Sequence, residues 1–348
     1  MSRPKAALLS TPFDAHGGPD GRAHTLLDFS VNSNPFGPPE GLLEALRHAD
    51  ISTYPDPTSS EAKRAAAEKH SRPTSDTTFG NGTADLIHRL TSCYLERGRT
   101  ALIAAPTFGE YARATSLQGA RVVPIYPYQE SEVRPEPLLA AIEKRRPTLV
   151  FICHPNNPTG HAWHEEHLLE VAQVCSEQDA LLILDLAYLS LSDAPDTPLP
   201  ESAVQLYSLT KSFTVPGVRV GYAVAPAEVI RVLERAAPPW QVSAHAQHAA
   251  VWALSPKGEA FLERTVPLLL NEHRTFQAEL RASIEVSRTC TTFSLCEVRS
   301  GATFKLEAER AGFRVRDANS FGLPQHVRLA TRRPEENAQF LSWLRSHG

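Results

Sequence analysis

The sequence predicts an α/β protein in which a mostly parallel sheet is covered by helices and joined to a smaller α+β unit. Two observations support this prediction. Between residues 100 and 225, short apolar runs alternate with amphipathic segments, which is the pattern of parallel strands linked by crossover helices. Near residue 236 the pattern changes, because a Pro-Pro-Trp segment is followed by a long helical stretch and two further strand-like runs.

Six short apolar runs are the strand candidates of the large unit. They cover residues 101–105, 121–125, 148–153, 180–184, 204–209 and 220–224. Between two of them, residues 167–175 place four apolar side chains on one face at helical spacing, namely Leu168, Val171, Ala172 and Cys175. We therefore expect strands and helices to alternate through this part of the chain.

The chain divides into three segments. Residues 1–45 are rich in Gly and Pro and lack a core of their own, so we expect them to pack on the small domain. Residues 46–236 form the predicted large domain, and residues 237–348 form the small one. In the small domain a helical stretch from Ser243 to about Ser283 precedes two strand candidates, at 293–298 and 326–331.

Composition narrows the class of protein. The chain has 348 residues with 35 Lys and Arg, 39 Asp and Glu and a formal net charge of −4, and 42% of its residues are hydrophobic. These values are typical of a globular protein with a sizeable core. Because no block of like charges occurs, we expect neither a nucleic acid nor an anionic membrane as partner, and small molecules are favoured.

The sequence gives no sign of export or of a membrane span. The apolar stretch near the N-terminus is too short for a signal peptide, and the most apolar run, residues 180–191, carries Asp185 at its centre. The five cysteines are scattered and never occur in C-x-x-C spacing, so neither a disulfide framework nor a zinc ribbon is predicted. We expect reduced thiols in the cytoplasm.

Polar motifs follow three neighbouring strand candidates. His-Pro-Asn-Asn-Pro-Thr-Gly (154–160) follows the third strand, Asp185 follows the fourth with Tyr188 three residues later, and Ser208-Leu-Thr-Lys211 follows the fifth. Open α/β sheets bind ligands at the carboxyl ends of their strands. We therefore expect these side chains to converge on one crevice.

Lys211 and Asp185 together indicate a particular cofactor. Burial lowers the pKa of a lysine, and a neutral amine is a nucleophile that can bind an aldehyde covalently. A carboxylate such as Asp185 can hold a protonated pyridine nitrogen and so make the ring an electron sink. These two roles define a site for pyridoxal 5'-phosphate.

The cofactor's phosphate requires anion donors. The segment 80–90, Gly-Asn-Gly-Thr-Ala-Asp-Leu-Ile-His-Arg-Leu, is a Gly-rich turn that opens into an apolar-periodic helix. Backbone N–H groups of Thr83 and Ala84 can meet an anion there with the helix dipole aligned. Ser208, Thr210 and Arg219 would complete the phosphate site.

The motifs HPNNPTG, D-x-A-Y, S-x-T-K and R-x-G-Y occur here in the order found in class I and II aminotransferases of the fold-type-I pyridoxal-phosphate enzymes, and the sequence resembles that family from about His16 to the C-terminus. The resemblance implies a three-layer fold with a mostly parallel seven-stranded sheet and a smaller α+β domain. It also implies a homodimer whose active sites are shared between subunits.

The resemblance assigns roles to individual residues. Asn157 and Tyr188 would hydrogen-bond the ring hydroxyl of the cofactor, Asp185 would pair with its ring nitrogen, and Lys211 would bind it covalently. Phe108 would stack on the ring. Tyr54 would reach the phosphate bound by the neighbouring subunit.

Within the family the chain resembles the branch that holds histidinol-phosphate aminotransferase and threonine-phosphate decarboxylase. Residues 28–39 resemble the N-terminal substrate segment of both, with Asn34 at the matching position. Arg328 would grip a substrate carboxylate with the bidentate geometry of a guanidinium, and Arg316 and His16 would hold the substrate's own phosphate.

Three features favour the decarboxylase, which would place the protein in synthesis of the cobalamin side arm. They are His16-Gly-Gly, the segment 208–222 and the segment 327–341. Histidinol-phosphate aminotransferase or another amino-acid transaminase is the alternative, and a non-catalytic protein that binds pyridoxal phosphate is a more remote one. The sequence does not decide between decarboxylation and transamination, because the bond that breaks depends on its orientation to the ring.

Simpler interpretations remain for single residues. Asp185 alone could be a helix cap, Arg316 could be a solvated strand-end arginine, and His16 could have no role. Three histidines at 161, 164 and 167 are spaced i, i+3, i+6, which would allow only a distorted metal site, so no metal is predicted.

Overall fold

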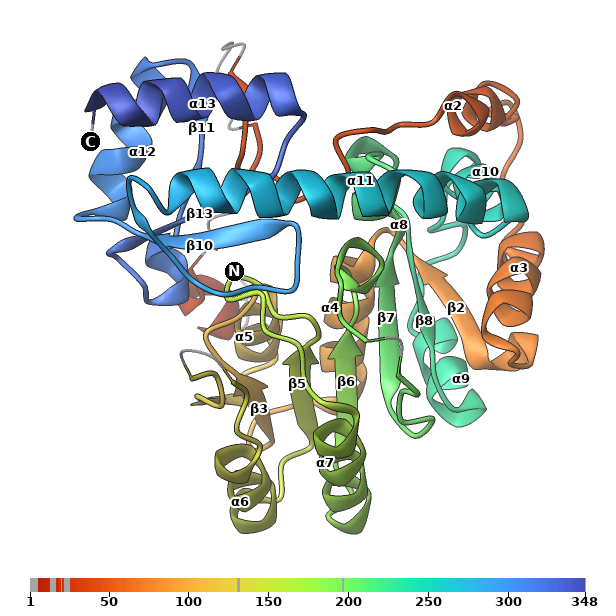
Figure 1. The fold of residues 1–348 in the computed structure, drawn as a ribbon. Helices are drawn as coiled ribbons and strands as arrows, with labels where there is room; N and C mark the ends of the chain where they lie inside the picture. The colour runs from red at the N-terminus through yellow and green to blue at the C-terminus, as the bar shows by residue number, and fades with distance from the viewer. Residues whose placement is uncertain are drawn as a thin grey trace.

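The computed structural model describes residues 6–12, 17–19, 21, 26–129, 132–195 and 197–347. Within these residues the chain forms a large α/β unit and a smaller α+β unit, and the long helix α11 (Pro256–Leu280) runs from one to the other (Figure 1). In the same part of the chain, no helix has both the length and the apolar character needed to cross a membrane.

The large sheet has seven strands in the described residues, in the order β2-β8-β7-β6-β5-β3-β4. Their bounds are β2 Thr77–Gly80, β3 Thr100–Ala104, β4 Arg121–Ile125, β5 Leu149–Cys153, β6 Leu181–Asp185, β7 Val204–Ser208 and β8 Gly221–Val224. Strands β4, β3, β5, β6 and β7 are parallel, whereas β8 is antiparallel to both β7 and β2. The prediction of a mostly parallel seven-stranded sheet is confirmed.

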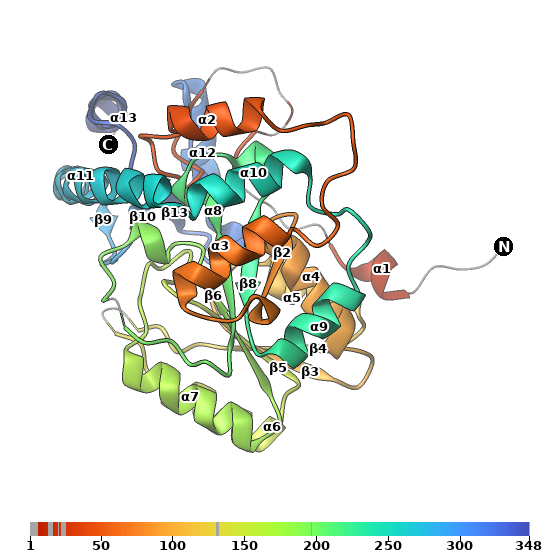
Figure 2. The ribbon, with the colours of Figure 1, turned by 90° about the vertical axis from the view of Figure 1, so that its right-hand side faces the viewer.

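Helices cover both faces of this sheet and give three layers (Figure 2). One face carries α4 (Thr83–Tyr94), α5 (Glu110–Leu117) and α9 (Ala227–Arg235), and the other carries α6 (Glu136–Arg145) and α7 (Glu165–Glu177). Phe151 of β5 points into the first layer and Ile152 into the second, so both neighbours are fully buried. Strands that are buried on both faces have continuous apolar sequences, so these strands could be predicted from the sequence.

The predicted helix from 243 to 283 is two helices. Helix α10 (Ala244–Ala253) ends before Ser255, and α11 begins at Pro256, since proline fits the first turn of a helix but cannot continue a preceding one. Helix α10 packs against α2 (Glu40–Arg47) and α3 (Ser60–His70) beside β2 and β8. It therefore lies with the large unit, whereas the sequence placed residues 237–348 together in the small domain.

The small unit is built on a four-stranded antiparallel sheet, in the order β12-β13-β10-β9. Its strands are β9 Glu285–Val286, β10 Phe293–Glu297, β12 Arg316–Asp317 and β13 His326–Ala330, and α12 (Gly301–Arg310) and α13 (Pro334–His347) pack on it. Strand β1 (Leu27–Asp28) pairs with β11 (Phe313–Arg314), and Phe29 enters the core of this unit. The N-terminal segment thus packs on the small unit through β1, while α2 packs on α10.

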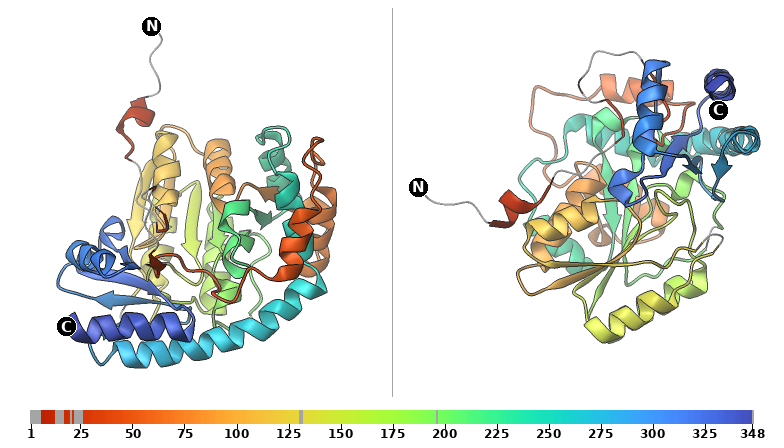
Figure 3. Two further views of the ribbon diagram at one scale, coloured as in Figure 1. Left: turned by 90° about the horizontal axis from the view of Figure 1, so that it is seen from above. Right: turned by 90° about the vertical axis from the view of Figure 1, so that its left-hand side faces the viewer.

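The remaining elements are short. They are α1 Ala6–Ser10, α8 Leu209–Ser212 and the 3-10 turns Thr74–Asp76, Leu189–Leu191, Pro216–Val218 and Asn319–Phe321. Seen from above, α11 and α13 lie side by side along one edge of the molecule (Figure 3), in agreement with their contacts. The carboxyl ends of β5, β6 and β7 and the small unit together surround the candidate site.

Candidate active site

Two adjoining cavities lie at the carboxyl ends of the central strands. The smaller has a volume of about 140 Å³ and the larger about 490 Å³. Six residues line both of them: Ala84, Phe108, Asn157, Tyr188, Lys211 and Arg219. Most of the predicted strand-end residues are therefore brought together in one place, as expected for an open α/β sheet.

Lys211 lies where the two cavities meet. It belongs to the single-turn helix α8, which follows β7 directly. Burial lowers the pKa of Lys211 to about 8, and the positive charges of Arg328 and Arg219 act in the same direction. A substantial fraction of the amine is therefore neutral near pH 8 and can act as a nucleophile.

Asp185 is the last residue of β6 and lines the smaller cavity with only 4% of its surface exposed. The Tyr111 hydroxyl donates to Oδ2 at 2.7 Å and the Ala187 N–H donates to Oδ1 at 3.1 Å. Burial raises the pKa of Asp185, although both hydrogen bonds oppose this effect. The carboxylate is thus held in a fixed orientation with one side toward the cavity.

The anion site is formed where α4 begins. Gly82 has a φ of +82° and precedes Thr83, the first residue of the helix. A Cβ at Gly82 would lie 2.6 Å from Nη2 of Arg219, and one at Gly221 would lie 2.8 Å from the Thr83 nitrogen. A Cβ at Gly82 would therefore displace the Arg219 guanidinium, and one at Gly221 would collide with the backbone at the helix start.

Hydroxyl groups complete the smaller cavity. The Ser208 and Thr210 hydroxyls lie 2.9 Å apart, and both residues line it together with Thr83 and Ala84. Backbone N–H groups at a helix start, two hydroxyls and a guanidinium are the donors that a phosphate requires.

Asn157, Tyr188 and Phe108 form the walls shared by the two cavities. Tyr188 packs edge-on against Phe293 with ring centroids 5.1 Å apart, and burial raises its pKa to about 12, so its hydroxyl stays protonated. Phe108 packs edge-on against Tyr111. An aromatic face and two hydrogen-bonding side chains thus border the space above Asp185.

Arg328 lies in the wall of the larger cavity and is 5% exposed. Its Nη1 donates to Oδ1 of Asn157 at 2.5 Å and its Nη2 to the Ser30 carbonyl at 2.6 Å. Among the described residues no carboxylate forms an ion pair with it, and its Nε has no hydrogen-bond partner. Burial lowers the pKa of Arg328 to about 10, yet it remains cationic at neutral pH. A buried cation without a carboxylate partner favours an anionic ligand.

Arg316 lines the same cavity and is 5% exposed. Its guanidinium donates to the Ser320 hydroxyl at 2.6 Å and lies over the Phe321 ring, 5.1 Å from its centroid. The sequence left open a solvated strand-end arginine, but the side chain is buried at the cavity wall. Arg316 and Arg328 therefore both present a buried guanidinium to the larger cavity, which Arg113 and Arg219 also line.

Two of the predicted residues do not line the two cavities, and a third lies outside the described residues. Asn34 is fully buried, but its amide donates to the Thr265 hydroxyl at 2.9 Å and its backbone N–H donates to the Lys211 carbonyl at 3.0 Å, so it braces the lysine segment instead of facing a substrate. Tyr54 is 77% exposed and stacks on Trp240, at a centroid distance of 4.4 Å. His16 lies outside the described residues.

Two residues at the site were missed by the sequence analysis. Asn32 is 2% exposed, lines the larger cavity and forms no hydrogen bond through its amide. It stands two residues before Asn34 in the same motif, and nothing in the sequence distinguishes the two. Tyr111, the donor to Asp185, is fully buried in α5, and the sequence analysis assigned it no role.

The site fits pyridoxal 5'-phosphate on structural grounds. The glycines at 82 and 221 leave space at the helix start for a phosphate, Asp185 presents a buried carboxylate for a ring nitrogen, and Lys211 stands between the two cavities. In the described residues no group of three or more His, Cys, Asp or Glu side chains could hold a metal ion.

A family model for class I and II aminotransferases matches residues 24–344. Fold and site together define a pyridoxal-phosphate-dependent enzyme that acts on small amino compounds. The chain belongs to the class I and II aminotransferase family.

Curated relatives cover nearly the whole chain. An aromatic amino acid aminotransferase from Thermobifida fusca is 31% identical over 343 residues, which is 95% of this chain and 92% of that protein. A histidinol-phosphate aminotransferase from Caldanaerobacter subterraneus is 26% identical over 325 residues, covering 90% and 91% of the two chains.

Solved structures have the same fold. The histidinol-phosphate aminotransferase of Sinorhizobium meliloti, in complex with pyridoxal-5'-phosphate, matches with a TM-score of 0.86 at 21% identity and covers 100% of this chain and 99% of its own. The L-threonine-O-3-phosphate decarboxylase of Porphyromonas gingivalis matches with a TM-score of 0.79 at 24% identity and covers 92% and 99%.

Proposed function

We propose that the protein is an aminotransferase of the histidinol-phosphate type, which exchanges the amino group between a small phosphorylated amine and a dicarboxylic amino acid. The observation that carries the proposal is the pair of buried guanidinium groups, Arg316 and Arg328, in the same cavity as Lys211. The names of several curated relatives support this substrate type.

This proposal reverses the order favoured by the sequence. The sequence motifs favoured threonine-phosphate decarboxylase, but the comparisons support the transaminase alternative better. Curated histidinol-phosphate aminotransferases match over 90% or more of the chain, whereas the solved decarboxylase structure matches at 24% identity. It stays the second candidate, because two arginines can hold the carboxylate and the phosphate of one molecule. Only if the protein is the decarboxylase would a role in cobalamin synthesis follow.

The chain's own residues divide the work of the reaction. Bound pyridoxal phosphate supplies an electron sink conjugated with the substrate Cα. Lys211, once released from the cofactor, is positioned to carry a proton at Cα, and its lowered pKa suits that exchange near neutral pH. Asp185 holds the proton of the ring nitrogen. Asn157 and Tyr188 orient the ring hydroxyl.

The two arginines orient the substrate. Arg328 would hold the carboxylate of the amino-acid substrate, fixed in place by Asn157 and the Ser30 carbonyl. Arg316 would hold the phosphate of the amine, together with His16. Orientation decides which bond at Cα lies perpendicular to the ring, and therefore which bond breaks.

One assay separates the two candidates. Purified holoprotein is incubated with histidinol phosphate and 2-oxoglutarate, and in a second vessel with threonine phosphate alone, and both glutamate and carbon dioxide are measured. The proposal predicts glutamate in the first vessel and no carbon dioxide in the second. Carbon dioxide from threonine phosphate without glutamate from the first vessel would replace it with the decarboxylase.

A further inference from the structure

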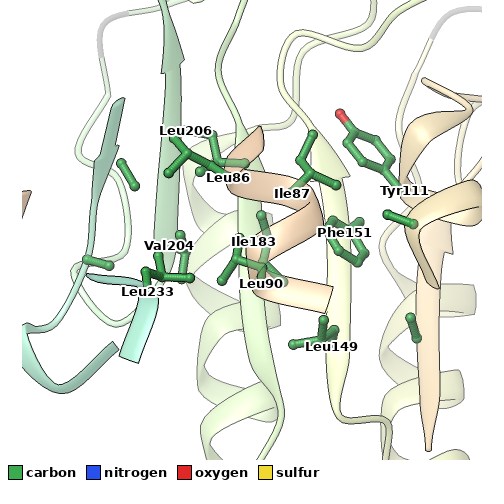
Figure 4. Packing of buried hydrophobic residues seen from close by; sticks show 14 of the residues in the cluster. Leu86, Ile87, Leu90, Tyr111, Leu149, Phe151, Ile183, Val204, Leu206 and Leu233 are labelled. Carbon is green, nitrogen blue, oxygen red and sulfur yellow. The ribbon is translucent and has the colours of Figure 1, made fainter. Parts of the chain in front are cut away.

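Tyr111 lies next to the cofactor cavity without lining it. Its side chain is fully buried in α5 and stacks on Phe151 with ring centroids 5.0 Å apart and planes 9° apart. Figure 4 shows the ring at one end of the core cluster, with the hydroxyl oxygen directed away from Leu149. Tyr111 is not among the residues that line either cavity, so it acts through another group.

That group is Asp185. The Tyr111 hydroxyl donates to Oδ2 and the Ala187 N–H donates to Oδ1, so each carboxylate oxygen has one donor within the protein. We propose that Tyr111 is a positioning residue that keeps Asp185 ionised and correctly oriented for the ring nitrogen of pyridoxal phosphate. The proposal depends only on cofactor binding, so its test is independent of the substrate proposed above.

The surroundings of Asp185 explain why such a donor is needed. Burial favours the neutral carboxylic acid and raises the pKa of Asp185, whereas hydrogen bonds to the carboxylate favour the ionised form. Tyr111 stays a donor, because burial and the charge of Asp185 keep its own pKa well above the usual value.

The other titratable groups that face Asp185 are Cys153, Tyr188 and Lys211. Burial raises the pKa of the Cys153 thiol and of the Tyr188 hydroxyl, so both stay neutral below pH 8. Lys211 has a pKa of about 8 and stays largely cationic below pH 7. Asp185 is thus the group whose ionised form the Tyr111 hydroxyl favours.

The experiment compares cofactor affinity in the wild type and in Tyr111→Phe, which keeps the ring stacked on Phe151. Apoprotein is titrated with pyridoxal phosphate between pH 4.5 and 7.5, and binding is followed by quenching of tryptophan fluorescence. One charge-assisted hydrogen bond corresponds to about one pKa unit on Asp185. The ratio of wild-type to variant affinity should therefore increase as pH falls, toward about tenfold once Asp185 is protonated in both apoproteins. Ionisation of the free cofactor is the same in both titrations and cancels in this ratio.

Two controls make the result decisive. Tyr128→Phe removes the hydroxyl of a partly buried tyrosine, one that accepts from Trp163 Nε1 at 3.3 Å, and should leave the affinity unchanged at every pH. In an Asp185→Asn background, Tyr111→Phe should have no pH-dependent effect. A ratio that is the same at all pH values, or that persists with Asn at 185, would overturn the proposal and leave Tyr111 a packing residue.

Discussion

At the scale of single residues, Lys211 and Arg328 show how the fold creates reactivity from burial. Arg328 lacks a carboxylate partner among the described residues and contributes to the lowered pKa of Lys211. An anionic substrate bound at Arg328 would neutralise part of this field. The same arginine can therefore both recruit substrate and favour the neutral amine in its absence.

The lowered pKa of Lys211 has a consequence for stability. In the unfolded chain a lysine titrates near 10.4, whereas in the folded apoprotein Lys211 titrates at about 8. Between these values the unfolded state binds more protons, so the contribution of Lys211 makes the folded state more stable as pH rises from 8 to 10.4, by at most about 3 kcal/mol. Below pH 8 the contribution is constant.

We therefore compare the free energy of unfolding of wild-type apoprotein with that of Lys211→Met, both measured with urea. The difference, wild type minus variant, should increase between pH 8 and 10. Other titrating groups are common to both proteins and cancel in the difference. A difference that stays constant over this range would show that the amine titrates normally in the folded state.

Sequence reasoning at this scale succeeded where a residue follows a buried strand directly. Asp185 and Lys211 are fixed by the ends of β6 and β7, so their positions follow from the strands. Asn34 and Asn32 lie in an irregular segment, and only the tertiary contacts with Lys211 and Thr265 decide which of them braces the lysine and which faces the cavity. Tyr111 was missed because its partner lies 74 residues away.

At the scale of elements, the start of α4 and the start of β8 lie together at the place where we propose that the cofactor's phosphate binds. A Cβ at Gly82 would displace the Arg219 guanidinium, and one at Gly221 would collide with the Thr83 backbone. The effect of a Cβ at Gly82 can be compared with that at another glycine of positive φ. Gly98 also has a positive φ, of +95°, but a Cβ there would have no neighbour within 4 Å.

We expect Gly82→Ala to weaken binding of pyridoxal phosphate to apoprotein by about tenfold or more, because the added methyl displaces Arg219 from the anion site. Gly98→Ala also adds a Cβ at a positive φ but meets no neighbouring atom, so it should leave the affinity unchanged. Equilibrium dialysis at neutral pH measures both. Equal losses in the two variants would indicate general destabilisation, and no loss in Gly82→Ala would remove Arg219 from the phosphate site.

Long or doubly buried elements were predictable and short ones were not. The six strand candidates agree with β3 to β8 within about one residue at each end, because continuous apolar runs mark buried parallel strands. Strand β2, with the sequence Thr-Thr-Phe-Gly, was missed, since its pairing with β8 supplies the stability that its composition does not. The two-residue strands of the small unit were missed for the same reason.

At the scale of the whole molecule, three separate parts of the chain enclose the larger cavity. Lys211 and Asn157 come from the large unit, Arg316 and Arg328 from the small unit, and Ser30 from the N-terminal segment. The Arg328–Asn157 hydrogen bond links two of these parts directly. Substrate binding is therefore coupled to the relative position of the two units.

A shared active site would explain the exposed stack of Tyr54 on Trp240. We propose that Tyr54 serves the phosphate site of a second copy of the chain.

This proposal can be tested by mixing two variants. Tyr54→Ala and Lys211→Ala variants, each of low activity alone, should regain activity when unfolded together and refolded as a mixture. Random pairing puts one intact site in half of the dimers, so about a quarter of wild-type activity should return. No recovery in mixed dimers, verified by mass spectrometry, would place Tyr54 in its own subunit's site or in none.

The central claim is that Lys211 carries the cofactor. The direct measurement is to treat purified holoprotein with borohydride, digest it and map the modified peptide by mass spectrometry. The account predicts a phosphopyridoxyl group on Lys211 and none on the partly exposed Lys69, which forms an ion pair with Glu259. Modification of another lysine, or a Lys211→Ala variant that still yields a reduced adduct at one specific site, would contradict it.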